Sequence, residues 1–301
     1  MIRDKAGDRG YWDKWISFNE EAISKVEDAL TRPSGNPAYR AQFAWDLSKE
    51  YTRLILRRYC RGDAIRELPV YFDGLLHAWE RSNRFAAQIC LDRGLPSCRD
   101  WDFNLSNLNH YNYCFWLVGL ALALDVTTEQ WSRLIALIGD EERDLLLDRV
   151  IAKHSPQRRI GKELLHPKPY SRLMMAVDAT PDTQAALLLD FVENWYSELN
   201  RPTPKNSGEP SCRPYWYDFG DQGKVPLESG SYFGRWCIEA VATVKAFQLD
   251  DQLCLGREYY PGDLLRPDGP STHRSHRSEE KGGSARGLKG IVSKILGKPG
   301  E

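Results

Sequence analysis

Apolar residues recur at helical spacing through the first 93 residues of this chain. Trp12, Ile16 and Ile23 lie four and seven residues apart, which is the spacing of one face of an amphipathic helix. The same period runs through residues 37–60 and 67–93. The break Pro33-Ser-Gly-Asn-Pro37 follows the first stretch, Gly62 the second and Gly94-Leu-Pro96 the third. Because such breaks end helices, the pattern predicts three long helices in the amino-terminal third.

Two later stretches are apolar enough to predict buried helices. Residues 106–124 are apolar nearly all round, which places their helix at the centre of the fold. Residues 229–248 are expected to form another, with Gly230 and Gly234 on one face, where a second backbone can approach closely. Shorter helices are expected over residues 128–137, with Thr128 as the cap, and over residues 141–153, 167–177 and 180–199.

Alternating strand patterns are almost absent, so we predict an all-α protein of roughly ten helices, packed as a single bundle-like body or as two helical halves. Residues 1–165 would form an amino-terminal helical region and residues 166–267 a carboxy-terminal one. Residues 268–301 have no sustained apolar period and are expected to be a disordered, basic tail. A short basic amphipathic stretch in this tail would suit a membrane surface or a partner, although a plain flexible tail is the simpler interpretation; its apolar residues are Leu288, Ile291, Val292, Ile295 and Leu296.

The composition is that of a globular protein, with 42% apolar and 11% aromatic residues in a chain of 301. No apolar run approaches the roughly 20 residues that a bilayer requires, and the charged start predicts a cytoplasmic protein without a signal peptide. Seven cysteines form an odd set without a C-x-x-C pair, so we expect reduced and mostly buried thiols.

A net charge of −1 hides an asymmetry along the chain. Residues 1–177 carry 26 basic and 24 acidic side chains, whereas residues 178–267 carry 8 and 14, and residues 268–301 carry 7 and 4. The acidic stretch would repel nucleic acid and attract a basic surface, such as the DNA-binding face of a nuclease. A solvated acidic face is the simpler interpretation.

Residues that could support catalysis or hold a metal are sparse. Glu163 and His166 have the E-x-x-H spacing of di-iron bundles, but a second such pair is missing and Pro167 follows at once, so a histidine at a helix end is favoured. His77 and Glu80 share a helix face, where a local polar pair is favoured over an acid and base couple. No phosphate-binding loop or nucleophile motif occurs. We therefore predict no enzyme activity, no cofactor and no metal site.

Two stretches carry a resemblance to a known family. Near the carboxy terminus, Tyr232-Phe-Gly-Arg-Trp-Cys-Ile-Glu-Ala-Val is followed by Leu249-Asp-Asp251 and then by Tyr259-Tyr-Pro261. This order resembles the signature of the PoNi-type immunity proteins, and the segment Tyr11-Trp-Asp-Lys-Trp-Ile-Ser-Phe is similar to the opening helix of the same family. The resemblance covers most of residues 8–265.

The resemblance implies a function in defence against toxins. Proteins of this family neutralise polymorphic nuclease toxins, such as those delivered by type VI secretion. It implies an immunity protein, kept in the cytoplasm of the toxin producer, that binds the DNase domain of its cognate effector and occludes the DNA-binding and active-site cleft. Such toxins carry a restriction-endonuclease-like fold with a metal-dependent site. Direct binding of nucleic acid by the immunity protein is not expected.

The acidic balance of residues 178–267 suggests how the toxin would be bound. Acidic groups would stand in for DNA phosphates and cover the basic cleft. The candidates are Asp218, Asp221, Glu228, Asp250, Asp251, Glu258 and Asp263. An exosite mechanism, in which binding beside the active site blocks DNA sterically, stays open. So do a helical adaptor or scaffold for a non-nuclease partner, a helical hydrolase built on His77 or His166, and a homodimer.

Most other signature residues have a structural interpretation. Glu239 lies inside an apolar helix, so we expect its carboxylate to be paired or hydrogen-bonded with a structural partner such as an arginine. Asp250 and Asp251 are expected to cap the turn after this helix. An aromatic clamp against the helix end is expected from Tyr259, Tyr260 and Pro261. Departures from the family pattern, which leave open the toxin recognised, are Arg235, Gln248 and the run Cys254-Leu-Gly-Arg257.

Overall fold

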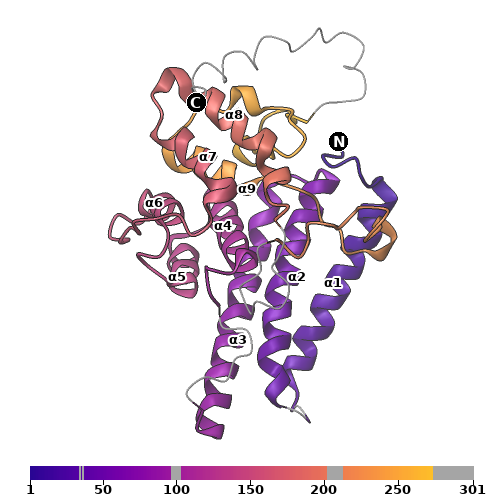
Figure 1. The fold of residues 1–301 in the computed structure, drawn as a ribbon. Coiled ribbons are helices and arrows are strands. Elements are labelled where there is room, and N and C mark those ends of the chain that lie inside the picture. The colour runs from indigo at the N-terminus through magenta and orange to yellow at the C-terminus, as the bar shows by residue number, and fades with distance from the viewer. Residues whose placement is uncertain (34, 36, 96–102, 202–212, 274–301) are drawn as a thin grey trace. The chain divides into compact units, whose positions relative to one another are not determined.

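The computed structural model describes residues 1–33, 35, 37–95, 103–201 and 213–273 (Figure 1). In this part of the chain the secondary structure comprises nine α-helices and five short 3-10 helices, and β-structure is limited to isolated bridges at Phe219, Asp221 and Val225. The prediction of an all-α protein is confirmed. The chain forms two compact units: residues 1–140 with 214–235, here called unit 1, and residues 141–213 with 236–301, here called unit 2.

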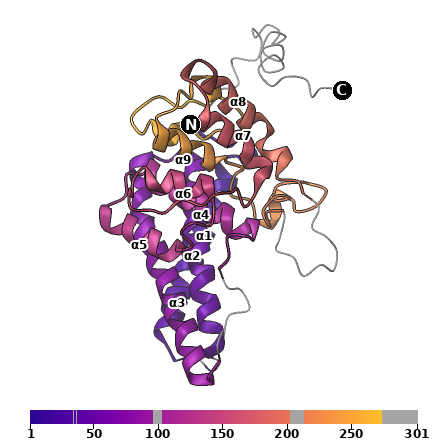
Figure 2. The same cartoon turned by 60° about the vertical axis from the view of Figure 1, so that its left-hand side comes forward.

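Three long helices dominate unit 1, as the apolar period predicts. They are α1 (Arg9–Thr31), α2 (Arg40–Arg61) and α3 (Phe72–Arg93). α2 lies between the other two and packs against both (Figures 1 and 2). The Asp8 side chain begins α1 by accepting a hydrogen bond from the Tyr11 amide at 2.7 Å, which satisfies a donor at the open helix end.

The remaining helices of unit 1 are α4 (Leu108–Ala123) and α5 (Thr128–Ile138). Nearly every residue of α4 is buried, as its apolar sequence predicts. Tyr113 of α4 bonds through its hydroxyl to Ser48 and Thr52 of α2, both at 3.0 Å. α5 begins with a capping box between Thr127 and Gln130, so the predicted cap at Thr128 is wrong by one residue.

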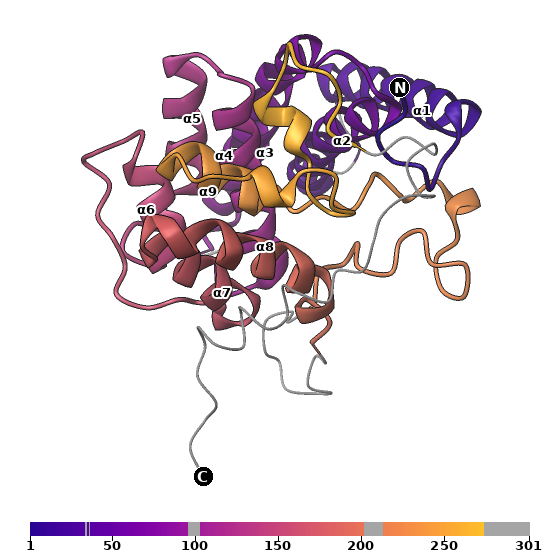
Figure 3. The same cartoon turned by 90° about the horizontal axis from the view of Figure 1, so that it is seen from above.

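Unit 2 contains α6 (Leu145–Ala152), α7 (Pro167–Asp178), α8 (Pro181–Glu198) and α9 (Ile238–Phe247). α7 packs against α8, and α6 and α7 both contact α9 (Figure 3). α6 begins later than predicted, because Glu142 has a φ of 62° and Asp144 caps the helix by accepting from the Leu147 amide at 2.7 Å. Pro181 occupies the favoured first turn of α8, as predicted.

The predicted buried helix over residues 229–248 is wrong in its first half. Gly230 and Gly234 have φ angles of 71° and 97°, which a right-handed helix does not allow. A 3-10 turn (Leu227–Ser229) ends at Gly230, and helical structure begins only at Ile238. The two glycines therefore shape an irregular segment and do not form the packing face of a helix.

The cysteines follow the prediction in part. Cys60, Cys114, Cys237 and Cys254 are buried free thiols, as expected, whereas Cys90 takes part in a disulfide, so the expectation of a reduced thiol is wrong there. Cys98, Cys212 and the basic amphipathic stretch after residue 287 lie outside the described residues. Within the described residues, no helix is long and apolar enough to cross a membrane.

Candidate functional site

Residues 230–235, which contain the start of the signature, form an irregular segment of unit 1 that we call the strap. Arg57 of α2, which is 3% exposed, holds the strap by its main chain. Its Nη2 donates to the carbonyl oxygen of Gly230 at 2.6 Å, and its Nε lies 3.5 Å from that of Tyr232. Its Nη1 donates to Asn19 of α1 at 2.8 Å. One guanidinium therefore joins α1, α2 and the strap.

Side-chain packing fixes the strap in the same place. A Cβ atom at Gly230 would lie 2.1 Å from the Trp15 ring, so only glycine fits at this left-handed position. The Tyr232 hydroxyl donates to Asp4 at 2.7 Å. Burial raises the pKa of Tyr232 well above its ordinary value, and the Asp4 carboxylate raises it further, so the phenol stays a donor. Phe233 is buried in the core.

The second half of the signature belongs to unit 2 and contains a buried carboxylate. Glu239 of α9 is 0% exposed, and its Oε1 accepts from the Tyr170 hydroxyl at 2.8 Å and from the Trp195 indole at 3.2 Å. Both donors are neutral side chains, and they supply the structural partners that the sequence led us to expect for this buried carboxylate. Burial, with the nearby Glu239, raises the pKa of Cys237 well above its ordinary value, so this thiol is protonated and unreactive at neutral pH.

Asp251 lies at the centre of a second buried network in unit 2. The Tyr260 hydroxyl donates to its Oδ2 at 2.6 Å, and Arg266 binds both of its oxygens. Burial raises the pKa of Tyr260, and the carboxylate of Asp251 raises it further. The expected cap is found at Asp250, which accepts from the Gln252 amide at 2.9 Å. The two adjacent aspartates thus differ, since Asp250 is exposed and Asp251 is buried, with 5% of its surface accessible.

Tyr259 contacts the start of α9 through its main chain and α8 through its ring, which differs from the aromatic clamp against the helix end that the sequence led us to expect. Its carbonyl oxygen accepts from the Cys237 amide at 2.8 Å, directly before α9, and its ring packs on Tyr196 with 5.1 Å between centroids. Asp263, a few residues later, is 3% exposed and accepts from the Ser271 and Thr272 hydroxyls, both at 2.8 Å. Asp263 therefore ties the end of the described chain to the fold.

The seven acidic candidates are divided between the units and differ in exposure. Glu228, Asp250 and Glu258 are exposed, and none of them forms an ion pair with another described residue. Lys224 brings two others together, since its Nζ lies 2.7 Å from Asp218 and 3.7 Å from Asp221. Unit 1 holds Asp218, Asp221 and Glu228, and unit 2 holds Asp250, Asp251, Glu258 and Asp263.

Sequence reasoning missed Arg57, the residue that holds the signature in place. A signal was present, because Arg57 directly follows the apolar run Leu54-Ile55-Leu56 within a predicted helix. An arginine on a buried helix face needs acceptors within the fold. Which acceptors it finds depends on the strap, whose irregular path the sequence did not predict.

The residues examined for catalysis are not brought together in a catalytic arrangement. Glu80 pairs with Arg133 of α5 at 2.7 Å, while His77 is exposed. His166 is buried directly before α7, and Glu163 lies in the irregular segment preceding it, so the two do not share a helix face. Within the described ranges, no three His, Cys, Asp or Glu side chains are grouped to hold a metal ion.

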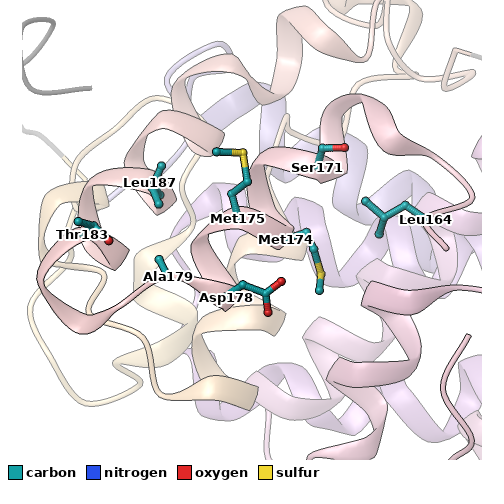
Figure 4. A pocket seen from close by; sticks show the side chains of 8 residues that line it. All are labelled: Leu164, Ser171, Met174, Met175, Asp178, Ala179, Thr183 and Leu187. Carbon is teal, nitrogen blue, oxygen red and sulfur yellow. The ribbon is translucent and has the colours of Figure 1, made fainter. Parts of the chain in front are cut away.

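A hollow of about 430 Å³ lies on unit 2 beside α7 and the start of α8 (Figure 4). Its lining includes the apolar side chains of Met174, Met175 and Leu187 and the carboxylate of Asp178. Asp178 pairs with Arg149 of α6 at 2.8 Å. Thioether and aliphatic walls suit an apolar side chain of a partner.

Fold and signature together describe an all-helical protein in which the buried signature residues Tyr232, Glu239 and Asp251 take part in side-chain hydrogen bonds. The family domain described as PoNe immunity protein (PoNi), N-terminal, matches residues 3–136, and the domain described as PoNe immunity proteins (PoNi), C-terminal, matches residues 142–264. The chain belongs to the family of PoNe immunity proteins.

The fold also occurs in a solved structure. Protein PA2201 from Pseudomonas aeruginosa is similar to this chain with a TM-score of 0.66 and 19% identity, over 88% of this chain and 90% of that one. At this identity the similarity shows the fold alone. No curated protein matches the chain.

Proposed function

We propose that this protein binds the DNase domain of a cognate type VI secretion toxin in the cytoplasm of the producing cell and neutralises it by occluding the DNA-binding and active-site cleft. The observation that carries this proposal is the match of both halves of the chain to PoNe immunity proteins. Signature residues such as Tyr232, Glu239 and Asp251 are buried and already hydrogen-bonded within the protein, so the toxin contact is assigned to side chains that remain exposed.

Three exposed carboxylates are the strongest candidates for that contact. Glu228, Asp250 and Glu258 have no ion-pair partner within the described part of the chain, so binding a cation would not break an existing pair. If these carboxylates take the place of DNA phosphates, their attraction to a basic cleft would make the association of the two proteins fast at low salt. Asp221, 43% exposed beside Lys224, would contribute less, because its charge is partly neutralised.

Asp251 and Asp263 would act indirectly. Both are buried, and both accept hydrogen bonds from neighbouring chain segments. Presenting either carboxylate to a toxin would break those bonds and leave buried donors unpaired. Within the proposal they fix the backbone that displays Asp250 and Glu258.

Co-expression with the cognate nuclease domain tests the immunity function itself. We expect cells that carry both proteins to survive, cells that carry the nuclease alone to die, and the two proteins to purify as a complex. Death of the co-expressing cells without a complex would contradict the proposal and favour a helical adaptor with a non-nuclease partner.

Charge reversal tests the acidic contact. Lysine at Glu228, Asp250 and Glu258 together should slow association with an inactive nuclease domain, weaken affinity by at least about tenfold and flatten its salt dependence. Lysine at Glu67, Asp92 and Glu129, three exposed carboxylates outside residues 178–267, changes the net charge equally and should have a much smaller effect. Equal effects of the two triple variants would show that only total charge matters.

A further inference from the structure

A groove of about 530 Å³ lies in unit 1 between the end of α1 and the start of α2. It belongs to a different part of the chain from the acidic candidates. Apolar and cationic side chains dominate its walls, with a single carboxylate among them. The lining residues are Lys25, Val26, Asp28, Ala29, Leu30, Arg32, Pro33, Arg40 and Phe43.

Two aromatic side chains at this groove are exposed to solvent. Phe43 lines the groove and is 53% exposed, and Tyr39, one helical turn before it, is 58% exposed. Their ring centroids lie 6.4 Å apart. Single exposed apolar residues are common, but adjacent aromatics beside a groove are typical of the anchors that dominate protein interfaces.

Among the described residues, Arg40 is the cation of the groove that has no carboxylate partner. Lys25 pairs with Glu21 at 2.5 Å, and Arg32 pairs with Asp28. Arg40 donates to the carbonyl oxygen of Leu30 at 2.7 Å and lies 4.4 Å over the ring of Phe85, and neither contact neutralises its charge. Its Nε finds no acceptor within the described residues. The groove therefore combines an apolar wall with a net positive charge.

We propose that this groove docks a segment of the toxin that presents an apolar side chain next to a carboxylate. The inference rests on the proposed function and adds a second contact of opposite charge, away from the basic cleft of the nuclease. The carboxylate would neutralise Arg40 while the apolar side chain packs on Phe43. A second copy of this chain fits less well, because a symmetric contact through the groove would oppose two Arg40 charges.

Filling the groove gives the first test. Ala29 is exposed and lines the groove, so Ala29→Arg blocks it without disturbing the core. Ser17→Arg is the matched control, since Ser17 is exposed on the same helix, about 18 Å away along its axis. We expect Ala29→Arg to weaken binding of an inactive cognate nuclease domain by at least about tenfold and Ser17→Arg by less than about twofold, by titration calorimetry.

The sign of the partner's charge gives the second test. Phe43→Glu and Phe43→Lys remove the same aromatic contact but place opposite charges at the groove. If the partner presents a carboxylate, the glutamate variant should bind several-fold more weakly than the lysine variant. The reverse order would overturn the anionic partner, and unchanged binding by Ala29→Arg would overturn the docking site.

These outcomes separate the groove from the proposed function. Normal binding and inhibition by Ala29→Arg would leave the immunity function standing and reject the groove, whereas failure of the unaltered protein to bind the nuclease would reject both. Sedimentation of the protein without the nuclease tests whether a second copy of this chain fills the groove. A dimer that Ala29→Arg dissociates would show that a second copy fills the groove and would overturn the toxin contact.

Discussion

The guanidinium of Arg57 donates to the carbonyl oxygen of Gly230 at 2.6 Å, across 173 positions of sequence. Burial lowers the pKa of Arg57, which reflects the cost of removing this cation from water. The acceptors that offset this cost are main-chain carbonyls of the strap and Asn19. The signature segment is therefore held by a cation that lies outside it.

Removing this cation should loosen the strap. We expect Arg57→Met to destabilise the protein by about 3 kcal/mol, because buried carbonyl oxygens lose their donor. Urea unfolding measures the change. Arg84→Met, at an exposed position of α3, should shift the free energy of unfolding by less than about 0.5 kcal/mol. Equal effects of the two substitutions would show that Arg57 does not hold the strap.

A methyl group at Gly230 should be poorly tolerated. Gly230→Ala meets the Trp15 ring at 2.1 Å and forces an L-residue to a φ of 71°, for which we expect a loss of about 3 kcal/mol. Thermal unfolding checks this. In the background of Trp15→Ala the same substitution should cost less, because only the backbone strain remains. Strict additivity of the two substitutions would contradict the packing contact.

The adjacent aspartates Asp250 and Asp251 should separate stability from binding. Asp251→Ala leaves Tyr260 and Arg266 without their buried acceptor, so we expect a loss of about 3 kcal/mol. Asp250→Ala removes one exposed cap and should cost less than about 1 kcal/mol. Urea unfolding measures both values.

Affinity for the nuclease domain should follow the opposite order. Asp250→Ala should weaken it, since this carboxylate is exposed, whereas Asp251→Ala should leave it nearly unchanged under conditions where the variant stays folded. If folded Asp251→Ala bound the nuclease domain more weakly and Asp250→Ala bound it normally, the assignment of the toxin contact to Asp250 would be wrong.

His110 should make stability depend on pH. Burial lowers its pKa from the ordinary value of 6.5, and its Nδ1 accepts from the Asn104 amide at 3.0 Å. Below pH 6.5 His110 becomes protonated in the unfolded chain but stays neutral in the folded protein. The free energy of unfolding therefore falls as the pH drops toward the lowered pKa of His110. Urea unfolding at pH 7.5 and 5.5 should show a smaller loss for His110→Gln than for the unaltered protein. An equal loss would exclude this histidine as the cause.

The long helices α1, α2 and α3 could be predicted because each needs only a periodic apolar face. The helix over residues 229–248 was predicted too long, because Phe233 and Trp236 suit a helix as well as they suit the buried irregular segment in which they lie. The left-handed turn at Gly230 is held by contacts with Trp15 and Arg57, which lie far away in sequence. The local pattern of apolar and polar residues cannot predict contacts between residues so far apart in the sequence.

The acidic candidates show the same limit. Composition indicates where negative charge is concentrated, but Asp251 and Glu258 look alike in sequence. Only the fold shows that the Asp251 carboxylate accepts hydrogen bonds from Tyr260 and Arg266, whereas the Glu258 carboxylate is exposed. Sequence therefore identifies an acidic region, and tertiary packing decides which carboxylates can meet a partner.

Competition between this protein and DNA for the nuclease domain tests occlusion most directly. A catalytically inactive nuclease domain bound to labelled duplex DNA would be titrated with the protein, and anisotropy with native mass spectrometry would follow the complexes. Occlusion predicts that DNA is released as the protein binds, without a ternary complex. A stable ternary complex of nuclease, DNA and this protein would contradict it.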